Sequence, residues 1–196
     1  MKEIEVEVAF DNSKEEVIRI LSKYEYIDEK EIYDTYYYDP QRPNLKPEED
    51  LRLNETFRVR KTDSSSYITY KKQHFKGKLW IYSDEYEISI GDADTIKKVI
   101  SLLGLKPLIE VHNKRKIYKH KNFEIELEEI DGLGLFIEVE KMSTLDNEIE
   151  IKEEIRDFIR SLKLKNVKEL NIGKNQYLIS KKLNREINIY NDTNYD

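Results

Sequence analysis

Polar and apolar residues alternate with a period of two along much of this chain. In KEIEVEVAF, residues 2–10, Glu residues at every second position alternate with Ile and Val residues. Successive side chains of a strand point to opposite faces of a sheet, so this stretch predicts a strand with one acidic and one apolar face. The same pattern predicts further strands over residues 32–40, 55–62, 66–73, 78–91 (one long strand or two), 110–119, 123–130 and 133–142.

Helical periodicity occurs between some of these strands and again after the last one. Residues 11–24 and 92–104 each place apolar residues on one helical face, and residues 147–163 do the same. Ser13, with Glu16 three residues later, is the pattern of a capping box that satisfies the free amides at a helix start. The sequence therefore predicts three amphipathic helices that need a sheet to cover.

The chain is expected to form one domain over residues 1–182. Its strands fall within residues 2–142, and a helical segment follows over residues 147–182. That segment either closes a site as a lid or packs as a plain helix, and the sequence leaves both alternatives open. The polar residues 183–196 are expected to form a disordered tail.

The polar faces of the predicted strands carry mostly one sign of charge each. For a single strand, a solvated sheet face explains this pattern. When several strands share it, helices can cover the apolar faces outside a barrel while the charged faces line its interior. Carboxylates there suit Mg²⁺ or Mn²⁺, and Arg and Lys suit phosphate oxygens. Strict alternation places on these faces Glu3, Glu5, Glu7, Arg58, Arg60, Thr69, Lys71, Glu85, Glu87, Arg115, Glu124, Glu126, Glu128, Glu138 and Glu140.

Composition narrows the class of protein. The 196 residues are 38% charged with a net charge of −6, and this acidic balance disfavours a nucleic-acid-binding role, which needs a basic face. There is no Cys, which excludes disulfides, thiolate zinc sites and a thiol nucleophile. No stretch approaches the roughly 20 apolar residues of a membrane span. We expect a soluble, cytoplasmic protein with no membrane partner.

An ordered set of motifs resembles one known group of proteins. The motifs are KEIEVEVAF, YDTYYYDP, FRVRK, ITYKK, DEYEISIGD, NKRKIY and ELEEIDGLGLFIEVE, and they cover residues 2 to 142. Together they resemble the CYTH, or triphosphate tunnel metalloenzyme, superfamily, and within it the class IV adenylyl cyclase branch. The resemblance implies an α+β fold: a closed eight-stranded antiparallel β-barrel, the triphosphate tunnel, with helices packed outside.

The resemblance also implies roles for individual residues. In the superfamily, carboxylates hold one or two divalent ions, Mg²⁺ or Mn²⁺, and basic side chains hold the triphosphate. The implied metal ligands are Glu3, Glu5, Glu85, Glu87, Glu138 and Glu140. The implied triphosphate ligands are Arg58, Arg60, Lys71 and Arg115. The implied catalytic residues are Glu138, Glu140, Glu128 and Lys71.

Three positions depart from the superfamily pattern. Glu7 stands where the N-terminal signature has a lysine, Ser83 replaces a basic residue before the mid-chain acids, and Asn113 replaces another before a Tyr. The predicted tunnel therefore holds ten Glu and four basic residues. This excess of acid leaves open a substrate with a cationic portion or a loss of activity.

Two classes of function follow. The first is a metal-dependent enzyme acting on a small-molecule triphosphate, either by phosphoanhydride hydrolysis or by class IV adenylyl cyclase chemistry, which converts ATP to cyclic AMP and pyrophosphate. The alternative is a binding module that holds an organic phosphate without turning it over, motivated by Glu7, Ser83 and Asn113. A homodimer is a further open option. The sequence does not decide between hydrolase, cyclase and binding module.

Overall fold

A computed structural model describes residues 2–77, 79–144 and 146–195 of the chain. The helices are α1 Lys14–Leu21, α2 Ala93–Leu102, α3 Glu148–Ser161 and α4 Lys174–Lys182, with a short 3₁₀ turn, η1, at Pro43–Leu45. The strands are β1 Lys2–Ala9, β2 Glu25–Tyr38, β3 Glu55–Thr62, β4 Ser66–Lys76, β5 Leu79–Ile90, β6 Lys106–His120, β7 Phe123–Ile130, β8 Gly134–Ser143 and the two-residue β9 Lys168–Glu169.

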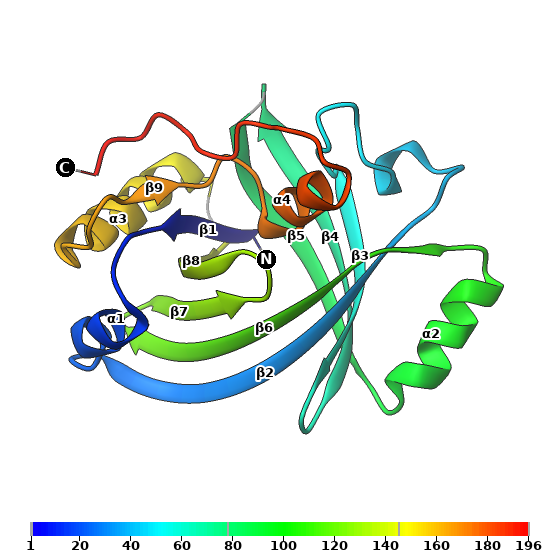
Figure 1. The fold of residues 1–196 in the computed structure, drawn as a ribbon, viewed down its shortest axis with the longest axis horizontal. Coiled ribbons are helices and arrows are strands. Elements are labelled where there is room, and N and C mark those ends of the chain that lie inside the picture. Colours follow the sequence, from blue (N-terminus) through cyan, green and yellow to red (C-terminus); the bar gives the residue numbers. More distant parts are fainter. Residues whose placement is uncertain (1, 78, 145, 196) are drawn as a thin grey trace.

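Eight of these strands close into an antiparallel barrel. Their order is β5-β4-β3-β2-β6-β7-β8-β1, and β1 pairs with β5 through Lys2↔Asp84 and Glu3↔Ser83. In Figure 1, β1, β8, β7, β6 and β2 curve along one side of the barrel, and β3, β4 and β5 form the other. The α+β fold and the closed eight-stranded barrel are therefore confirmed; β9 adds to the outer edge of β1 at Val8 and Ala9.

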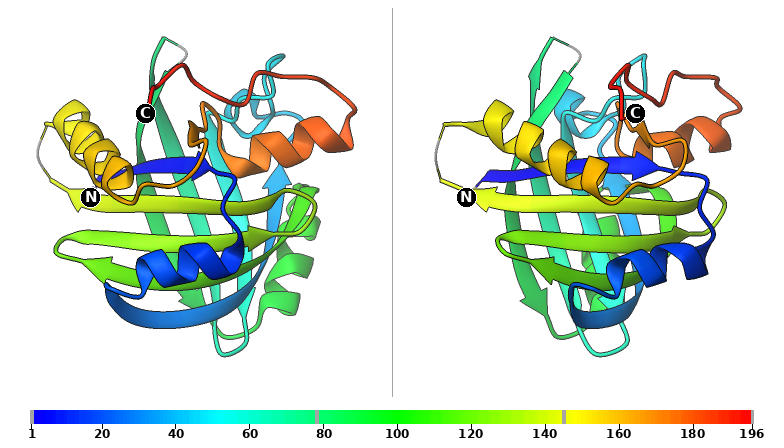
Figure 2. Two further views of the ribbon diagram at one scale, coloured as in Figure 1. Left: turned by 60° about the vertical axis from the view of Figure 1, so that its left-hand side comes forward. Right: turned by 90° about the vertical axis from the view of Figure 1, so that its left-hand side faces the viewer.

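The apolar faces of the strands point outward and helices cover part of them, whereas Tyr86 and Ile88 on the outside of β5 are exposed. Ile4 and Val8 of β1 are completely buried, as are Ile155 and Ile159 of α3. Figure 2 shows α1 and α3 lying against the wall made by β1, β8 and β7, and α2 packs near β3 on the other side. Each fully buried Ile contributes about 2 kcal/mol. Because burial fixes the apolar faces outward, the charged faces are left to line the interior.

Some element boundaries differ from those predicted. β2 begins at Glu25 rather than residue 32, and residues 25–30 are exposed, so no apolar alternation marks them. Pairing with β6 holds this stretch, starting at Glu25↔Lys119. β5 is a single strand, and Lys78, the first residue of the predicted strand, lies outside the described residues.

Helix α1 begins as its sequence pattern indicates. The Ser13 hydroxyl accepts a hydrogen bond from the Glu16 amide, and the Glu16 carboxylate accepts one from the Ser13 amide at 3.0 Å. Helix α2 is capped by Asp92 and followed by Gly104, whose φ of +92° favours glycine. Local interactions therefore mark the start of α1 and both ends of α2. No helix within the described ranges is long and apolar enough to cross a membrane.

The last residues of the chain run back along β9. The Asn171 amide donates to the Ile189 carbonyl at 2.8 Å, and the Asn191 amide donates to the Glu169 carbonyl at 3.0 Å. The Tyr195 hydroxyl also donates to Glu169. In this structure the tail over residues 183–195 is therefore held by contacts, whereas Asp196 lies outside the described residues. The division into one domain over 1–182 and a disordered tail stays a prediction.

Candidate functional site

The barrel interior is a charged cavity of about 490 Å³. All eight barrel strands and the start of α4 contribute to its lining. The ten predicted acids and four predicted bases all face it, so the alternation placed every one of them correctly. The cavity is lined by Glu3, Glu5, Glu7, Glu85, Glu87, Glu124, Glu126, Glu128, Glu138 and Glu140, with Arg58, Arg60, Lys71 and Arg115.

Arg58 and Arg60 lie together on β3 and share one carboxylate. Arg60 donates two hydrogen bonds of 2.8 Å to the oxygens of Asp34, and an Arg58 nitrogen lies 3.5 Å from the same group. Burial alone would raise the pKa of Asp34, but the two guanidinium groups lower it. Asp34 is 6% exposed, and sequence reasoning missed it. Among the described residues, the buried Nε of Arg58 has no hydrogen-bond partner.

Lys71 lies between two acidic strands. Its Nζ is 2.6 Å from a Glu3 oxygen and 3.2 Å from a Glu85 oxygen. Burial would raise the pKa of Glu3, but the adjacent ammonium lowers it to about 2. Ser83, one of the altered positions, donates its hydroxyl to Glu3 at 3.1 Å. A neutral donor thus replaces a basic residue while Glu3 remains bound by a cation.

Arg115 contacts two carboxylates of the neighbouring strand β7. Its guanidinium forms ion pairs with Glu126 and Glu128. Asn113, another altered position, donates its amide to Glu128 at 2.6 Å. The Nε of Arg115 is buried and has no hydrogen-bond partner within the described part of the chain. Two of the four predicted bases, Arg58 and Arg115, therefore each have a buried Nε–H without a partner among the described residues. A buried unpaired donor is unfavourable unless a ligand accepts its hydrogen bond.

Four carboxylates from β1 and β8 form the first acidic group. The antiparallel register pairs Glu5 with Glu140, and this brings one oxygen each of Glu3, Glu5, Glu138 and Glu140 within 4.8 Å of one another. Burial, followed by repulsion from neighbouring carboxylates, raises the pKa of Glu140 to about 10 and that of Glu5 well above its usual value. Such crowded oxygens can hold a divalent cation, which would relieve the repulsion.

Two of the predicted metal ligands, Glu85 and Glu87, do not belong to this group, although Lys71 contacts both Glu85 and Glu3. Glu85 and Glu87 are on β5, with oxygens 3.8 Å and 4.0 Å from Arg58. Thr69 also donates its hydroxyl to Glu87 at 2.8 Å. Neither residue belongs to the acidic groups found among the described residues. The assignment of Glu85 and Glu87 as metal ligands stays a prediction.

Lys174, the first residue of α4, is another site residue that sequence reasoning missed. Its Nζ lies 2.7 Å from Glu7 and 2.5 Å from Glu138, and it also contacts Glu128. These three carboxylates form a second acidic group, within 4.8 Å of one another. Burial and then the neighbouring carboxylates set the pKa of Glu7 at about 8, although the ammonium lowers it. Lys174 therefore occupies the centre of the second group, next to the altered position Glu7.

The crowding of the first group predicts a pH dependence of stability in metal-free protein. Because the folded-state pKa of Glu140 is raised from 4.5 to about 10, its contribution is fully present below pH 4.5 and is lost as pH rises towards 10. In EDTA, the free energy of unfolding of the unaltered protein should fall over this pH range. That of Glu140→Gln, whose side chain cannot ionise, should fall less. Urea unfolding at several pH values measures these free energies. The same dependence on pH in the two proteins would contradict the prediction.

With the fold and the site in place, comparison with known proteins identifies the family. The CYTH domain family model matches residues 1–171, so the chain belongs to the CYTH domain family. The match ends three residues before Lys174. The family assignment agrees with the barrel and with the charged interior described above.

Individual relatives support this assignment. A protein of Methanocaldococcus jannaschii, named provisionally as an adenylate cyclase, is 29% identical over 181 residues, covering 91% of this chain and 97% of its own length. The PH1819 protein of Pyrococcus horikoshii OT3 has a TM-score of 0.77 at 26% identity and covers 91% of this chain and 99% of that chain. A provisionally named adenylyl cyclase of Hippeastrum, described as having a dominant triphosphatase activity, shares the fold with a TM-score of 0.64 at 14% identity, covering 95% and 98%.

Proposed function

We propose that this protein is a divalent-metal-dependent enzyme that cleaves a triphosphate inside the barrel. The observation that carries the proposal is the juxtaposition of two unlike sets in one cavity. A crowded carboxylate group, Glu3, Glu5, Glu138 and Glu140, lies beside the bases Arg58, Arg60, Lys71 and Arg115. A metal–polyphosphate complex is a ligand that needs both sets at once.

The first acidic group is the better candidate for the metal. In the second group, Lys174 already places a cation among Glu7, Glu128 and Glu138. In the first, Lys71 contacts Glu3, but burial and mutual repulsion still raise the pKa of Glu5 and of Glu140. A bound Mg²⁺ or Mn²⁺ there would polarise a phosphoryl oxygen and neutralise developing charge. Glu138 belongs to both groups, so Lys174 orients a metal ligand.

The basic side chains would bind the phosphate oxygens. Arg58 and Arg115 each retain a buried Nε–H with no partner among the described residues, and phosphate oxygens are suitable acceptors. The ammonium of Lys71 contacts Glu85 and also Glu3, which belongs to the first acidic group. A phosphate bound to a metal in that group would therefore lie close to Lys71. Glu128 is held by Arg115, Asn113 and Lys174, and we assign it the role of orienting those donors.

Neighbouring groups compensate in part for the altered positions, which supports the enzyme over the binding module. Lys174 supplies, from α4, a cation beside the place where the N-terminal signature has its lysine. Ser83 and Asn113 donate hydrogen bonds to Glu3 and Glu128, so each carboxylate keeps a donor. The tunnel lining includes Lys30, Lys174 and Asp34 besides the predicted residues, so it holds six bases and eleven acids and its excess of acid is five rather than six.

Hydrolysis and cyclisation are distinguished by their products. The name of the Methanocaldococcus jannaschii relative favours cyclase chemistry as the second candidate. The protein would be incubated with Mg²⁺ or Mn²⁺ and with tripolyphosphate, ATP or thiamine triphosphate. Orthophosphate identifies a hydrolase, and cyclic AMP with pyrophosphate identifies a cyclase. Metal-dependent binding of every substrate without product would instead support the binding-module alternative.

A further inference from the structure

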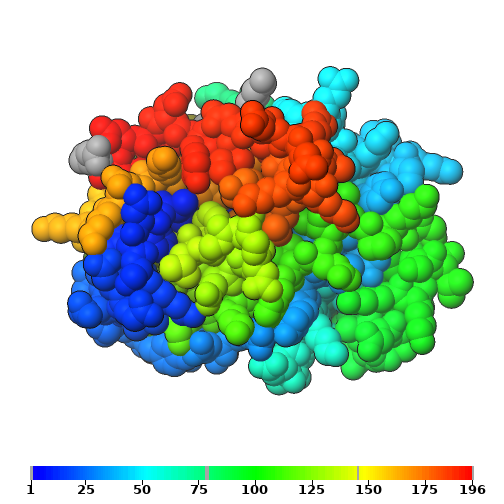
Figure 3. Space-filling model, viewed as in Figure 1, coloured from blue at the N-terminus to red at the C-terminus, as the bar shows by residue number. Residues whose placement is uncertain are grey.

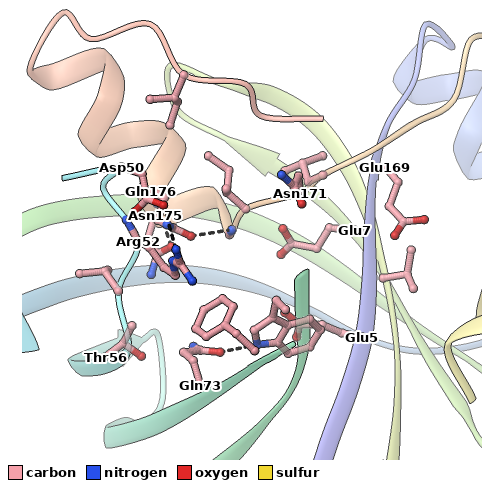
Figure 4. Close-up of a pocket in the computed structure, with 18 of the residues that line it drawn as sticks. Glu5, Glu7, Asp50, Arg52, Thr56, Gln73, Glu169, Asn171, Asn175 and Gln176 are labelled. Carbon is pink, nitrogen blue, oxygen red and sulfur yellow. Dashed lines mark hydrogen bonds and ion pairs between the residues drawn. The ribbon is translucent and has the colours of Figure 1, made fainter. Parts of the chain in front are cut away.

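A second cavity adjoins the tunnel on the side of α4. Its volume is about 410 Å³, within the range of roughly 300–1,000 Å³ typical of small-molecule sites. Its walls include two aromatic side chains, Phe75 and Trp80. Figure 4 shows Glu7 and Arg52 on opposite sides of this cavity, which we call the annex. Lys152 of α3 lines the annex but not the tunnel.

Lys152 is buried in the annex wall without a carboxylate partner. It is 6% exposed, and no other lysine in the described part of the chain is buried as deeply. Its Nζ donates to the Trp80 carbonyl at 2.9 Å and lies 4.1 Å from the centre of the Trp80 ring. Among the described residues, no Asp or Glu forms an ion pair with it. Lys71 and Lys174, by contrast, contact two and three carboxylates respectively.

These surroundings favour the neutral amine. Burial lowers the pKa of Lys152 from 10.5 to about 8, although the more distant charges of Glu169 and Glu5 act to raise it. Arg156, on the same helix, binds Glu169 at 2.9 Å and lowers the pKa of Lys152 a little further. A desolvated lysine that is partly neutral near pH 8 is a nucleophile of the kind that forms Schiff bases with carbonyl compounds.

The rest of the annex lining indicates which carbonyl compounds fit. Phe75 and Trp80 provide aromatic surface, and the charged side chains of Arg52 and Asp50 bind each other at 3.0 Å. Gln176 also lines the annex, and its buried Nε2 has no hydrogen-bond partner among the described residues. A carbonyl oxygen would accept that unused hydrogen bond and remove the cost of leaving it unmade. A small aromatic aldehyde meets both requirements.

We propose that Lys152 is a nucleophilic amine that forms a Schiff base with an aromatic aldehyde bound in the annex. The Nζ lone pair attacks the carbonyl carbon, both protons of the neutral amine end on the carbonyl oxygen, and that oxygen leaves as water while a C=N bond forms. The step needs no oxidant or reductant. Once protonated from solvent, the imine is again a cation, which Glu5 and Glu169 favour and which can face the Trp80 ring. The inference does not depend on the proposed function, because Lys152 lies outside the tunnel lining.

Reductive trapping tests this inference on the full chain. The protein would be incubated with benzaldehyde and cyanoborohydride in EDTA, without phosphate compounds, and peptide mass mapping would identify the benzylated lysines. At pH 8, about half of an amine with a pKa of 8 is neutral, against about one in 300 for a pKa of 10.5. A less basic amine is also a weaker nucleophile, so we expect Lys152 to be labelled at least about tenfold faster than Lys98, exposed on α2. The ratio of the two rates should fall as pH rises towards 10.5, because exposed lysines then lose their protons too.

Three further measurements separate a nucleophile from a lysine that only holds Trp80 in place. Lys152→Arg keeps the positive charge and should abolish labelling at this position alone. Ile187→Phe fills the annex and should slow the labelling of Lys152 about tenfold while leaving Lys98 unchanged. Benzyl alcohol, which has the ring but no carbonyl, should protect Lys152 in the unaltered protein and leave Lys98 unprotected, so the test survives if Ile187→Phe does not fold.

The matched control is Lys98→Arg, which should remove only its own label. Labelling of Lys152 no faster than that of Lys98 at pH 8 would overturn the inference. Fast labelling of Lys152 that neither Ile187→Phe nor benzyl alcohol reduces would also overturn it, because the aldehyde would then not be bound in the annex.

Discussion

Replacing Lys174 with methionine is expected to destabilise the protein by about 3 kcal/mol and to reduce triphosphate turnover about 100-fold. The substitution keeps much of the side chain's length but leaves Glu128 and Glu138 buried without the ammonium that both contact. Repulsion would then raise the pKa of these carboxyls and disturb Glu138, which the metal group shares. Urea unfolding and Mg²⁺ titration measure the two effects separately.

Moving the lysine from position 174 to position 7 supplies the control. In the double variant Glu7→Lys with Lys174→Met, a lysine on β1 can place its ammonium beside Glu138, because the two positions are register partners. We expect this variant to recover most of the lost stability and Mg²⁺ affinity. Lys181→Met, on the exposed side of α4, should change stability by no more than about 0.5 kcal/mol. Absence of rescue, with a folded double variant, would show that Lys174 acts by some other route.

Glu138→Gln is expected to have the largest effect on activity, a loss of at least about 100-fold. Its oxygens belong to both acidic groups, so the change removes a candidate metal ligand and an ion-pair partner of Lys174 together. Glu140→Gln removes a candidate ligand only, since Glu140 is in the first group alone. Stabilisation by Mg²⁺, measured as a shift in melting temperature, should be lost in both variants.

The matched control for these variants is Glu110→Gln. Glu110 lies on β6, is exposed and does not line the tunnel. Its substitution should leave turnover and Mg²⁺ stabilisation as in the unaltered protein. If Glu138→Gln and Glu140→Gln keep full metal-dependent turnover, the metal site lies elsewhere and the assignment of the first acidic group is wrong.

The sequence was most informative where one face of a strand is buried. There, a shift of the strand register by one residue would expose the whole apolar face. The face on which residues such as Glu5 and Glu140 lie could therefore be predicted from alternation alone. Asp34 escaped this reasoning because its neighbours in YDTYYYDP are aromatic at both parities and hide which face is which. The early part of β2 escaped because residues 25–30 are exposed and carry no apolar pattern.

Lys174 could not be found by periodicity. It begins a short helix in a segment for which the sequence left a lid and a packing helix both open, and it lies beyond residues 1–171, which the family model matches. Its position depends on how α4 comes back over the barrel, a long-range arrangement that local sequence does not encode. Figure 3 shows α4 and the residues after it lying across one edge of the molecule. The ion pair between Glu7 and Lys174 depends on this arrangement and therefore could not be predicted from the sequence.

A crystal structure with Mn²⁺ and tripolyphosphate tests the central claim most directly. The anomalous signal of Mn²⁺ should lie among Glu3, Glu5, Glu138 and Glu140, and phosphate oxygens should accept hydrogen bonds from the Nε atoms of Arg58 and Arg115. Lys174 should remain in contact with Glu138. An Mn²⁺ ion among Glu7, Glu128 and Glu138 with Lys174 displaced, or a triphosphate bound outside the barrel, would contradict the account.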